Sequence, residues 1–445
     1  MNYLPSILSS LWQTGAGDLL VGSLPISSIA DRYGTPLFVY DHRILERKFA
    51  ALHEALPASF QVFYSMKANP NPFFLQFFVQ KGCGIEVASA GELEQALNAG
   101  CPPENILFAG PGKTESELVL AMSLGVGEIH AESRLEIERI IRIARLRNRP
   151  VRIAVRVNPC ADSLGGAMRM GGKSAPFGVD EENLLPILDL IRQSPQLRFR
   201  GVHLFAGTQI LDHQVLLAQY RRGIQIARNA YVATGLPLHT VDFGGGLGIP
   251  YFPGDAELNL QGLRDGLRDL MRSIEGAECF GSTRFVLEPG RFLVGDSGIY
   301  VTRVNDIKIS RGKKYVIVDG GMNHHLAASG NLGQVIKRNF PIAVLNKMDH
   351  PFAETVDVVG PLCTPLDTLA RTIDLPDVKV GDLVGIFQSG AYARSASPLG
   401  FLGHPSPPEV VVRDERDQLI SRRGSWADAA GQDPNERSLV LQAAS

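Results

Sequence analysis

The sequence is poor in cysteine and has no extended run of like charges. Its 445 residues include five cysteines with no C-x-x-C pair among them, so neither a disulfide framework nor a zinc site is indicated. They are Cys83, Cys101, Cys160, Cys279 and Cys363. The formal net charge is −2 and long basic runs are missing, which argues against nucleic acid or an anionic membrane surface as a partner. We expect no resident metal.

Long apolar runs are missing as well. No stretch approaches the roughly 18 to 20 apolar residues of a transmembrane helix. Residues 1–20 lack the charged start and the continuous apolar core of a secretory signal peptide. These features predict a cytoplasmic protein. With 44% hydrophobic and 20% charged residues, the chain has the composition of an ordinary globular protein, and it is long enough for two domains.

From about residue 42 the chain alternates short apolar strands with amphipathic helices, the pattern of a parallel sheet with crossover helices. Eight such units in roughly 250 residues fit a closed (β/α)₈ barrel of the TIM type better than an open sheet. The predicted strands lie near 61–67, 84–89, 106–110, 128–133, 151–158, 199–207, 239–246 and 284–290.

After Gly290 the helical periodicity disappears and β-rich runs separated by turn signals follow, which predicts a second, β-rich barrel or sandwich domain. These runs are 299–304, 314–318, 355–359, 382–387 and 409–412. We therefore expect an α/β barrel over 42–290 and a β-rich domain over 291–430. Residues 1–41 are expected to pack with the β-rich domain, and 431–445 to form a flexible tail.

In a barrel of this kind the active site lies at the carboxyl ends of the strands. At these ends the sequence places an amine, carboxylates, a triple glycine and arginines. They are Lys67 on the first strand, Glu86 and Ser89 on the second, Arg156 and Asn158 on the fifth, His203 and Phe205 on the sixth, Asp242 to Gly248 on the seventh, and Glu288 to Arg291 on the eighth. A strand-end lysine such as Lys67 is by itself most often a solvated charge.

Gly244, Gly245 and Gly246 lack a Cβ, so their backbone N–H groups can close on a phosphate. A plain strand-to-helix turn explains a glycine run equally well. Arg291 and Thr208 supply further donors on the same rim, and together they favour a phosphate site. No Gly-Lys-Ser/Thr follows, so a small phosphorylated cofactor is favoured over a nucleotide.

A lysine, a phosphate cradle and a carboxylate on one rim are what pyridoxal phosphate requires. Lys67 would form an imine with the cofactor's aldehyde, and an acid such as Glu288 would hold a proton on the pyridine nitrogen, so that the ring withdraws electrons. Spacing alone leaves a second role open for Glu288, that of an ion-pair partner of Arg291.

Six motifs, in order along residues 36–412, resemble those of the alanine-racemase-fold (fold type III) decarboxylases. That family includes the diaminopimelate and the ornithine, lysine and arginine decarboxylases. The motifs are YSMKAN at 64–69, VASAGE at 87–92, DFGGGLG at 242–248, EPGR at 288–291, GPLC at 360–363 and GAY at 390–392.

The resemblance implies a role for each matching residue. Lys67 would be the Schiff-base lysine and Glu288 the partner of the pyridine nitrogen, while Glu86 and Arg156 would lie near the other edge of the ring. It also implies a homodimer with shared active sites, in which Cys363 of one subunit protonates the substrate carbon in the other. The implied phosphate ligands are Thr208, Gly244, Gly245, Gly246, Arg291 and Tyr392.

The departures from the family pattern bear on the substrate. Phe205 stands where the family stacks a histidine on the cofactor ring, so stacking is retained and any protonic role is lost. Thr364 follows the cysteine where diaminopimelate and ornithine enzymes have an acid for the substrate's distal ammonium. A buried ammonium without its partner costs roughly 3–5 kcal/mol, so a basic substrate is disfavoured unless Asp367 or Glu86 replaces that acid.

A further departure lies at 397–405, which replaces the Asn-Tyr-Asn-x-Arg-Pro run of the diaminopimelate enzymes. His404 stands where their arginine reads the distal carboxylate, and a surface-loop histidine is the alternative. We expect Thr364, Asp367, Phe401 and His404 to face the substrate. Together the departures look most like the branch that includes the butirosin-type decarboxylase of carrier-protein-linked glutamate.

The resulting prediction is a pyridoxal-phosphate decarboxylase that removes the α-carboxylate of a non-basic or acyl-carrier-protein-linked amino acid. A diaminopimelate or ornithine/lysine decarboxylase is the first alternative. A racemase of the same fold would need a second base over the cofactor, a role that Cys363 fills only as a thiolate. The remaining alternatives are a non-catalytic regulator, against which the retained Lys67 argues, and a single-barrel cofactor carrier, which would lack the β-rich domain.

Overall fold

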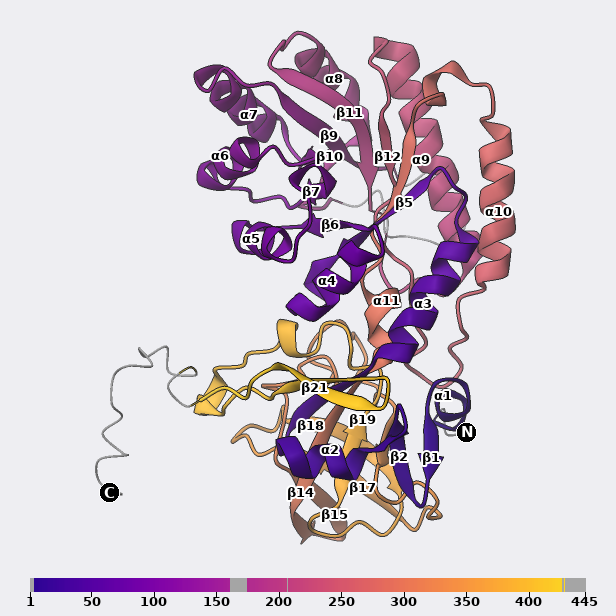
Figure 1. Ribbon diagram of the computed structural model, residues 1–445, viewed down its shortest axis with the longest axis vertical. Helices are drawn as coiled ribbons and strands as arrows, with labels where there is room; N and C mark the ends of the chain where they lie inside the picture. Colours follow the sequence, from indigo (N-terminus) through magenta and orange to yellow (C-terminus); the bar gives the residue numbers. More distant parts are fainter. Residues whose placement is uncertain (1–3, 161–173, 206, 426–427, 429–445) are drawn as a thin grey trace, which may run out of the picture. The chain divides into compact units, whose positions relative to one another are not determined.

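The computed structural model describes residues 4–160, 174–205, 207–425 and 428 (Figure 1). The chain forms two compact units. The barrel unit contains Phe49–Ile249 and Ala256–Phe292, and the β unit contains the residues up to Lys48, Pro250–Asp255 and the chain from Leu293 onward. The tail predicted at 431–445 lies outside the described residues.

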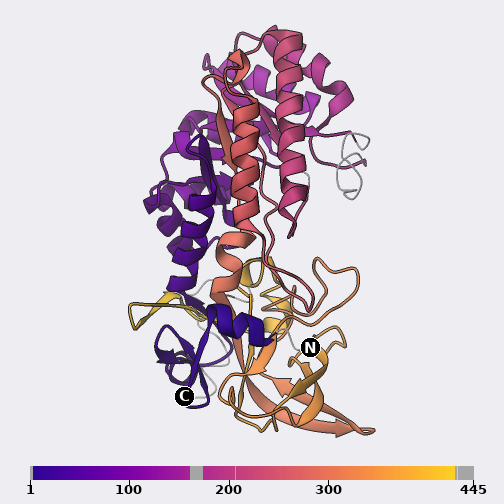
Figure 2. The same ribbon diagram turned by 90° about the vertical axis from the view of Figure 1, so that its right-hand side faces the viewer.

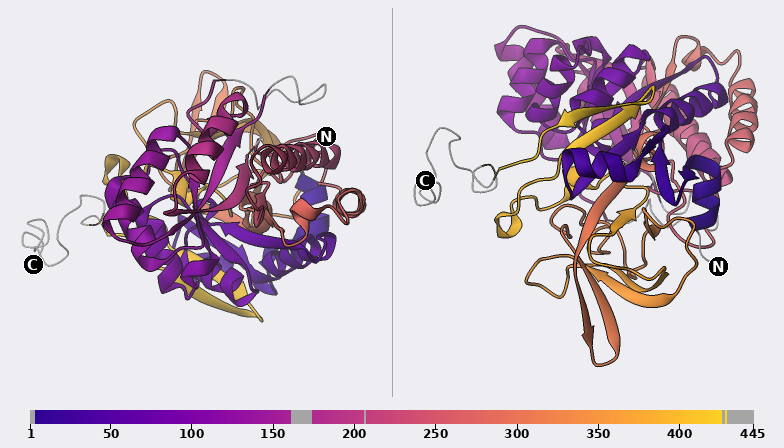
Figure 3. Two further views of the ribbon diagram at one scale, coloured as in Figure 1. Left: turned by 90° about the horizontal axis from the view of Figure 1, so that it is seen from above. Right: turned by 60° about the horizontal axis from the view of Figure 1, so that its bottom comes forward.

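Eight parallel strands close into a ring in the barrel unit, which confirms the predicted fold, and helices surround them in the view down the ring (Figure 3, left). The last strand pairs with the first, with Phe285 opposite Phe60. The strands are β5 (Phe60–Ser65), β6 (Gly84–Val87), β7 (Ile106–Phe108), β8 (Glu128–Ala131), β9 (Val151–Asn158), β11 (Leu197–Leu204), β12 (Thr240–Asp242) and β13 (Arg284–Leu287), and the two-residue strand β10 (Val179–Asp180) pairs beside β9.

Hydroxyl N-caps start three consecutive barrel helices. Ser89, Thr114 and Ser133 each accept a hydrogen bond from the backbone N–H of a glutamate three residues further on. Such caps satisfy N–H groups that a helix start leaves without partners, so the sequence fixes where these helices leave the barrel rim. The helices are α4 (Pro72–Gln80), α5 (Ala90–Asn98), α6 (Glu115–Leu124), α7 (Arg134–Leu146) and α8 (Leu184–Arg192).

The two longest described helices of the barrel unit, α9 (His213–Thr234) and α10 (Leu260–Ser273), lie side by side (Figure 2). Gly266 of α10 permits this close approach, since a Cβ there would lie 2.2 Å from a methyl carbon of Leu217 on α9. A glycine inside a helix costs about 1 kcal/mol relative to alanine, so its presence here has a packing reason.

The β unit is organised around one large sheet with the strand order β18-β17-β15-β14-β4-β20-β21, in which β19 also pairs with β14 and with β16. Five of these strands match the β-rich runs of the sequence. The strands are β4 (Leu37–Asp41), β14 (Gly298–Ser310), β15 (Lys313–Val318), β16 (Ile342–Val344), β17 (Glu354–Val359), β18 (Thr368–Leu375), β19 (Leu383–Ile386), β20 (Glu409–Arg413) and β21 (Arg416–Ser421). The antiparallel β14–β15 hairpin is visible in Figure 3 (right).

The N-terminal segment belongs to the same unit. It contributes α1 (Leu4–Leu11), α2 (Ile26–Tyr33), and a small sheet of β1 (Gln13–Gly15), β2 (Asp18–Val21) and β3 (Leu24–Pro25). Apolar side chains of this segment, including Ile7 and Trp12, share one buried core with Ile299, Leu383 and Val410. Helix α3 (His42–Ala55) follows β4, and α11 (Arg291–Val294) follows β13. Within the described ranges, no helix combines the length and the apolar character needed to cross a bilayer.

One difference from the expected strand ends concerns Lys67. Strand β5 ends at Ser65, which lies opposite Glu86 of β6, and Lys67 follows in the single 3₁₀ turn η1 (Met66–Ala68). The ladder between β5 and β6 cannot continue much further, because β6 ends at Val87, one residue after Glu86. The chain therefore turns after Ser65.

At the amino end of β8, Glu128 holds several strands together from inside the barrel. Its Oε1 accepts hydrogen bonds from Arg284 Nη2 and Thr240 Oγ1, both at 2.6 Å. We expect Glu128→Ala to lower the free energy of unfolding by about 3–5 kcal/mol, because it leaves a partly buried guanidinium without its counter-charge. Urea unfolding followed by far-UV circular dichroism measures this loss.

The matched control is Asp269→Ala, which breaks the solvent-exposed pair of Asp269 with Arg272. That change should alter the unfolding free energy by less than about 1 kcal/mol. Equal effects of the two substitutions would show that Glu128 does not brace the barrel.

Candidate active site

An amine and a carboxylate form an ion pair at the barrel rim. Lys67 Nζ lies 2.9 Å from Glu86 Oε2 and 3.1 Å from Oε1. Glu86 is buried and accepts a third hydrogen bond from Ser65 Oγ at 2.6 Å, while the lysine side chain remains half exposed. The pair therefore fixes where the lysine amine sits and leaves it accessible.

The glycine run after β12 packs closely against the backbone of neighbouring loops. Gly244 and Gly246 have φ of +67° and +101°, in the region that favours glycine. A Cβ on Gly245 would lie 2.6 Å from the carbonyl oxygen of Glu288, and one on Gly246 would lie 2.8 Å from that of Gly207. Loops that follow three successive barrel strands thus meet at these glycines.

The same loops offer hydrogen-bond donors. Gly244 N–H donates to Asp242 Oδ1 at 2.8 Å, whereas the N–H groups of Gly245 and Gly246 meet no acceptor among the described residues. Thr208 is exposed beside this run, and Arg291 is half-buried at the start of α11. Free N–H groups in a concave turn are a common anion site.

An arginine is held beside the aromatic ring of Phe205. Arg156 Nη1 pairs with Glu132 Oε1 at 2.9 Å, and the guanidinium lies 5.8 Å from the centroid of Phe205 and 5.0 Å from that of Phe177. Glu132 is buried and also accepts the N–H groups of Gly110 and Gly178. Phe205 keeps 41% of its surface exposed, so one face is available for stacking.

Below these groups, two histidines and two carboxylates fill the barrel interior. The Nδ1 atoms of His130 and His203 are 3.1 Å apart, so one ring donates and the other accepts. His203 Nε2 approaches Glu288 Oε2 to 3.4 Å, and His130 Nε2 approaches Asp242 Oδ2 to 3.9 Å. One ligand atom from each of these four side chains lies within 4.8 Å of the others, a spacing that a metal ion could bridge.

Burial sets the protonation of this interior group. It lowers the pKa of His203 to about 3, with the charge of Arg156 as the next cause. It also lowers the pKa of His130 well below its usual value, with His203 as the next cause. Burial raises the pKa of Asp242, and the charge of Glu288 raises it further. The two imidazoles are therefore neutral at physiological pH.

The predicted substrate residues of the β unit gather around one loop. Cys363 is exposed, and Thr364 Oγ1 accepts the N–H of Leu366 at 3.3 Å. Asp367 is only 3% exposed, and its two oxygens accept the N–H groups of Met322 at 2.7 Å and Leu362 at 2.9 Å. Its carboxylate thus shapes the loop 360–368, which carries Cys363 and which we call the cysteine loop.

The other predicted residues of this unit lie in turns. His404 is half-buried and close enough to Asp367 to lower its pKa, although burial is the larger effect and raises it. Phe401 keeps 41% of its surface exposed, and Tyr392 is half-buried with φ of +53°. The structure thus brings His404 near Asp367 within the β unit, and brings Lys67 to Glu86 within the barrel unit.

A comparison with known families identifies this arrangement. Residues 42–295, more than half of the chain, match the pyridoxal binding domain of pyridoxal-dependent decarboxylases. The chain belongs to this family. As a member, it is a carboxy-lyase that acts on an amino acid with pyridoxal phosphate as its cofactor.

Several relatives of this decarboxylase cover nearly its whole length. It is 37% identical over 419 residues to the L-glutamyl-[BtrI acyl-carrier protein] decarboxylase of Niallia circulans, covering 94% of this chain and 97% of that one. It is 34% identical over 424 residues to the diaminopimelate decarboxylase of Methanothermobacter thermautotrophicus, covering 93% and 94%. The crystal structure of diaminopimelate decarboxylase from Helicobacter pylori complexed with L-lysine has 29% identity and a TM-score of 0.80, covering 91% and 98%.

The described side chains of the decarboxylase fit its cofactor. Glu288 Oε1 is buried and has no hydrogen-bond donor among the described residues, as expected of an oxygen that faces a protonated ring nitrogen. The glycine run leaves the N–H groups of Gly245 and Gly246 without a described acceptor, and these can donate to a phosphate. The amine of Lys67 is accessible on the same barrel unit.

Two residues of the decarboxylase site were not identified from its sequence. Glu132 orients Arg156, and His130 contacts His203 in the barrel interior. Both lie at the carboxyl end of the fourth predicted strand, where no candidate was named. Polar residues inside an otherwise apolar strand are the signal that could have indicated them.

The close packing of Gly246 predicts a selective loss of cofactor affinity in Gly246→Ala. The added Cβ would collide with the carbonyl oxygen of Gly207 and would also demand a φ of +101° from alanine. We expect the dissociation constant for pyridoxal phosphate to rise at least about tenfold, which equals about 1.4 kcal/mol. Absorbance titration of the apoenzyme with the cofactor measures this constant.

Gly112→Ala is the matched control, because a Cβ at Gly112 would meet nothing within 4 Å. Its affinity for the cofactor should equal that of the wild type. Unchanged affinity in Gly246→Ala would mean that the glycine run does not hold the phosphate.

The lowered pKa of His203 predicts a pH dependence of stability. Below about pH 6.5 the unfolded chain binds a proton at this histidine while the folded chain does not, until the folded pKa of about 3 is reached. Stability therefore falls with decreasing pH by about 1.4 kcal/mol per unit for this group. His203→Gln should make the decline between pH 6 and pH 4 shallower by about one proton, as measured by urea unfolding at each pH.

His350→Gln serves as the control, since the His350 side chain is 58% exposed in the folded chain. The slope of stability against pH should stay as in the wild type. If His203→Gln also left the slope unchanged, His203 would not be buried as a neutral ring.

Proposed function

We propose that the substrate of this decarboxylase is an amino acid whose far end is joined to an acyl carrier protein, and not a free diamino acid. The observation that carries this proposal is the position of Asp367. It is the only carboxylate of the loop 360–368, and both of its oxygens already accept backbone N–H groups. Asp367 is also only 3% exposed, so a distal ammonium would meet no exposed acid in this loop.

Thr364, next to the cysteine, supports the same substrate class. It is half-buried, and its hydroxyl caps the turn that leads to Leu366. A hydroxyl group is a poor partner for a desolvated ammonium. It carries no charge, so it does not disfavour a neutral thioester or amide. Sequence similarity to the relative from Niallia circulans, whose name states a carrier-linked glutamate, also supports the proposal.

In the proposed site, the barrel unit supplies the cofactor ligands. Lys67 would bind the cofactor through its amine, which Glu86 positions. Thr208, Gly244, Gly245, Gly246 and Arg291 would hold the phosphate, and Tyr392 is proposed as a further phosphate ligand. Phe205 would stack on the ring, and Arg156 would lie near its edge. Pyridoxal phosphate, when bound there, withdraws electrons from the bond to the departing carboxylate.

Glu288 has a separate role in this proposal. Its buried Oε1 would hold a proton at the cofactor's ring nitrogen, and its Oε2 lies beside the neutral ring of His203. A neutral imidazole adds no positive charge beside this carboxylate that would compete with the ring nitrogen for it.

We further propose a homodimer in which Cys363 of one subunit donates its Sγ proton to the substrate's α-carbon in the site of the other. One observation supports this role: Cys363 is exposed, on a loop whose shape is held by buried hydrogen bonds. His404 and Phe401, also of the β unit, are proposed to face the substrate's far end.

The proposal predicts which substrates release CO₂. A glutamyl thioester or glutamyl-carrier protein should be decarboxylated with a kcat/KM at least about a hundredfold above that of free lysine, ornithine or diaminopimelate. This ratio follows from a cost of about 3–5 kcal/mol for an unpartnered ammonium. Release of ¹⁴CO₂ from each substrate, labelled at the α-carboxyl group, measures the ratio.

Lys67→Ala is the control in this assay and should release no CO₂ above background from any substrate. Rapid turnover of diaminopimelate by the wild-type enzyme would contradict the proposed substrate class. It would favour the alternative of a diaminopimelate decarboxylase.

A further inference from the structure

A segment beside the cysteine loop exposes large apolar side chains. Val335 and Ile336 are 104% and 78% exposed, and Leu366 of the cysteine loop is 48% exposed. A single exposed apolar residue is ordinary, but several together usually mark a contact surface. We call Leu332, Val335, Ile336 and Leu366, with the nearby cations Lys337, Arg338 and Arg371, the apolar-basic surface.

Specific hydrogen bonds hold this segment in place. Gln334 Oε1 accepts the N–H of Arg338 at 2.7 Å, and Lys337 Nζ donates to Asn331 Oδ1 at 2.6 Å. Asn331 Nδ2 donates in turn to the carbonyl oxygen of Leu366 at 3.2 Å. The exposed side chains therefore project from an ordered turn that is bonded directly to the cysteine loop.

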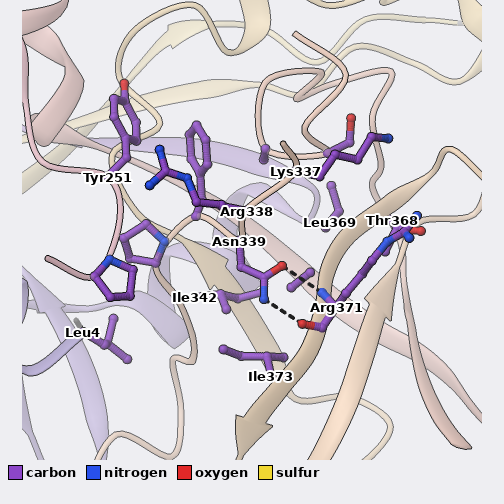
Figure 4. Close-up of a pocket in the computed structure, with 16 residues that line it drawn as sticks. Leu4, Tyr251, Lys337, Arg338, Asn339, Ile342, Thr368, Leu369, Arg371 and Ile373 are labelled. Carbon is purple, nitrogen blue, oxygen red and sulfur yellow. Dashed lines mark hydrogen bonds between the residues drawn. The ribbon is translucent and has the colours of Figure 1, made fainter. Parts of the chain in front are cut away.

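A groove of about 350 Å³ lies along the basic side of the surface (Figure 4). The Arg338 guanidinium stacks over the ring of Phe252 at 3.6 Å, and Asn339 forms two hydrogen bonds with the backbone of Arg371. The residues that line this groove include three cations and no carboxylate. Among the described residues, Lys337, Arg338 and Arg371 take part in no ion pair.

This local charge contrasts with the whole chain, whose formal net charge is −2. Unneutralised cations around apolar side chains match a partner that presents carboxylates around an apolar patch of its own. A nucleic acid is a poorer match, since three cations form no extended basic stripe and Val335 and Ile336 offer no base an aromatic face.

The surface also lies near the thiol of the same loop. Leu366 is three residues from Cys363, so the Cα atoms of these residues are at most about 11 Å apart. A substrate that arrives on a flexible arm requires its carrier to dock within reach of the groups that act on it. The edge of the apolar-basic surface meets this requirement for Cys363.

We propose that the apolar-basic surface is the docking site for the acidic carrier protein that delivers the substrate. This inference rests on the proposed carrier-linked substrate and names the surface that receives the carrier. Val335 and Ile336 form the apolar centre of the contact. Arg338 and Arg371 pair with carboxylates of the carrier at the edge of this contact. Lys337 adds a third positive charge and also keeps Asn331 in place through its hydrogen bond.

The test uses the holoenzyme and the double variant Ile336→Asp/Arg371→Glu. Lys337 is left unchanged because it supports the turn. Fluorescence anisotropy measures binding of a labelled acidic acyl carrier protein loaded with L-glutamate. We expect the dissociation constant to rise at least about tenfold in the variant, and wild-type binding to weaken at high salt.

The matched control is Leu419→Asp/Arg416→Glu on β21, which makes the same kinds of change at the opposite end of the sheet order from β18. The control should bind the carrier as the wild type does. Turnover of glutamyl pantetheine thioester, which has no carrier to dock, should be unchanged in both double variants.

The outcomes separate the inference from the proposed function. If the Ile336→Asp/Arg371→Glu variant bound the carrier with unchanged affinity, the docking site would be refuted even while the thioester was decarboxylated. If the thioester were not decarboxylated but the variant lost carrier binding, the docking site would stand and the proposed substrate would fail. A variant that became monomeric in light scattering and kept carrier affinity would assign the surface to a second copy of the chain.

Discussion

The pairing of the last barrel strand with the first is the interaction on which the site depends. Hydrogen bonds between β13 and β5 close the ring, and the N–H of Ser65 continues the contact by donating to the carbonyl oxygen of Pro289 at 3.3 Å. A Cβ on Gly290 would lie 2.9 Å from that of Ala68. This closure brings the turn that carries Lys67 against the turn that follows Glu288, although more than two hundred residues separate them in sequence.

The closed ring then has to accommodate polar groups that apolar strands would ordinarily exclude. The interior holds His130, His203, Asp242 and Glu288, each nearly or fully buried. Because burial keeps the two imidazoles neutral, the interior holds fewer charges than its four titratable groups could carry, which lowers the cost of burial. Burial also raises the pKa of Asp242. Among these groups, Glu288 keeps one oxygen, Oε1, without a donor among the described residues.

Much of this architecture could be predicted from the sequence. All eight barrel strands were predicted, because short apolar runs between amphipathic helices have few other solutions. In the β-rich chain after Gly290, strands β16, β18 and β21 were not, since β16 is short, β18 is interrupted at Thr372 with φ of +48°, and β21 is largely polar. The role of Glu132 was also hidden, because its partners Arg156, Gly110 and Gly178 come from loops and strands that only the fold brings together. Likewise, the spacing of Asp367 from Cys363 did not show that its carboxylate is buried and bonded to backbone N–H groups.

The place of β4 in its sheet affects how the chain can fold during synthesis. This strand, residues 37–41, pairs with β14 on one side and in parallel with β20 on the other. The barrel's last strand ends at residue 287 and β20 at 413, so 126 residues must still be made after the barrel sequence is complete. At about 5–20 residues per second this takes roughly 6 to 25 seconds. Throughout that interval, the edge of β4 that later pairs with β20 has no partner, so it is open to pairing with any other strand on the same or a neighbouring ribosome.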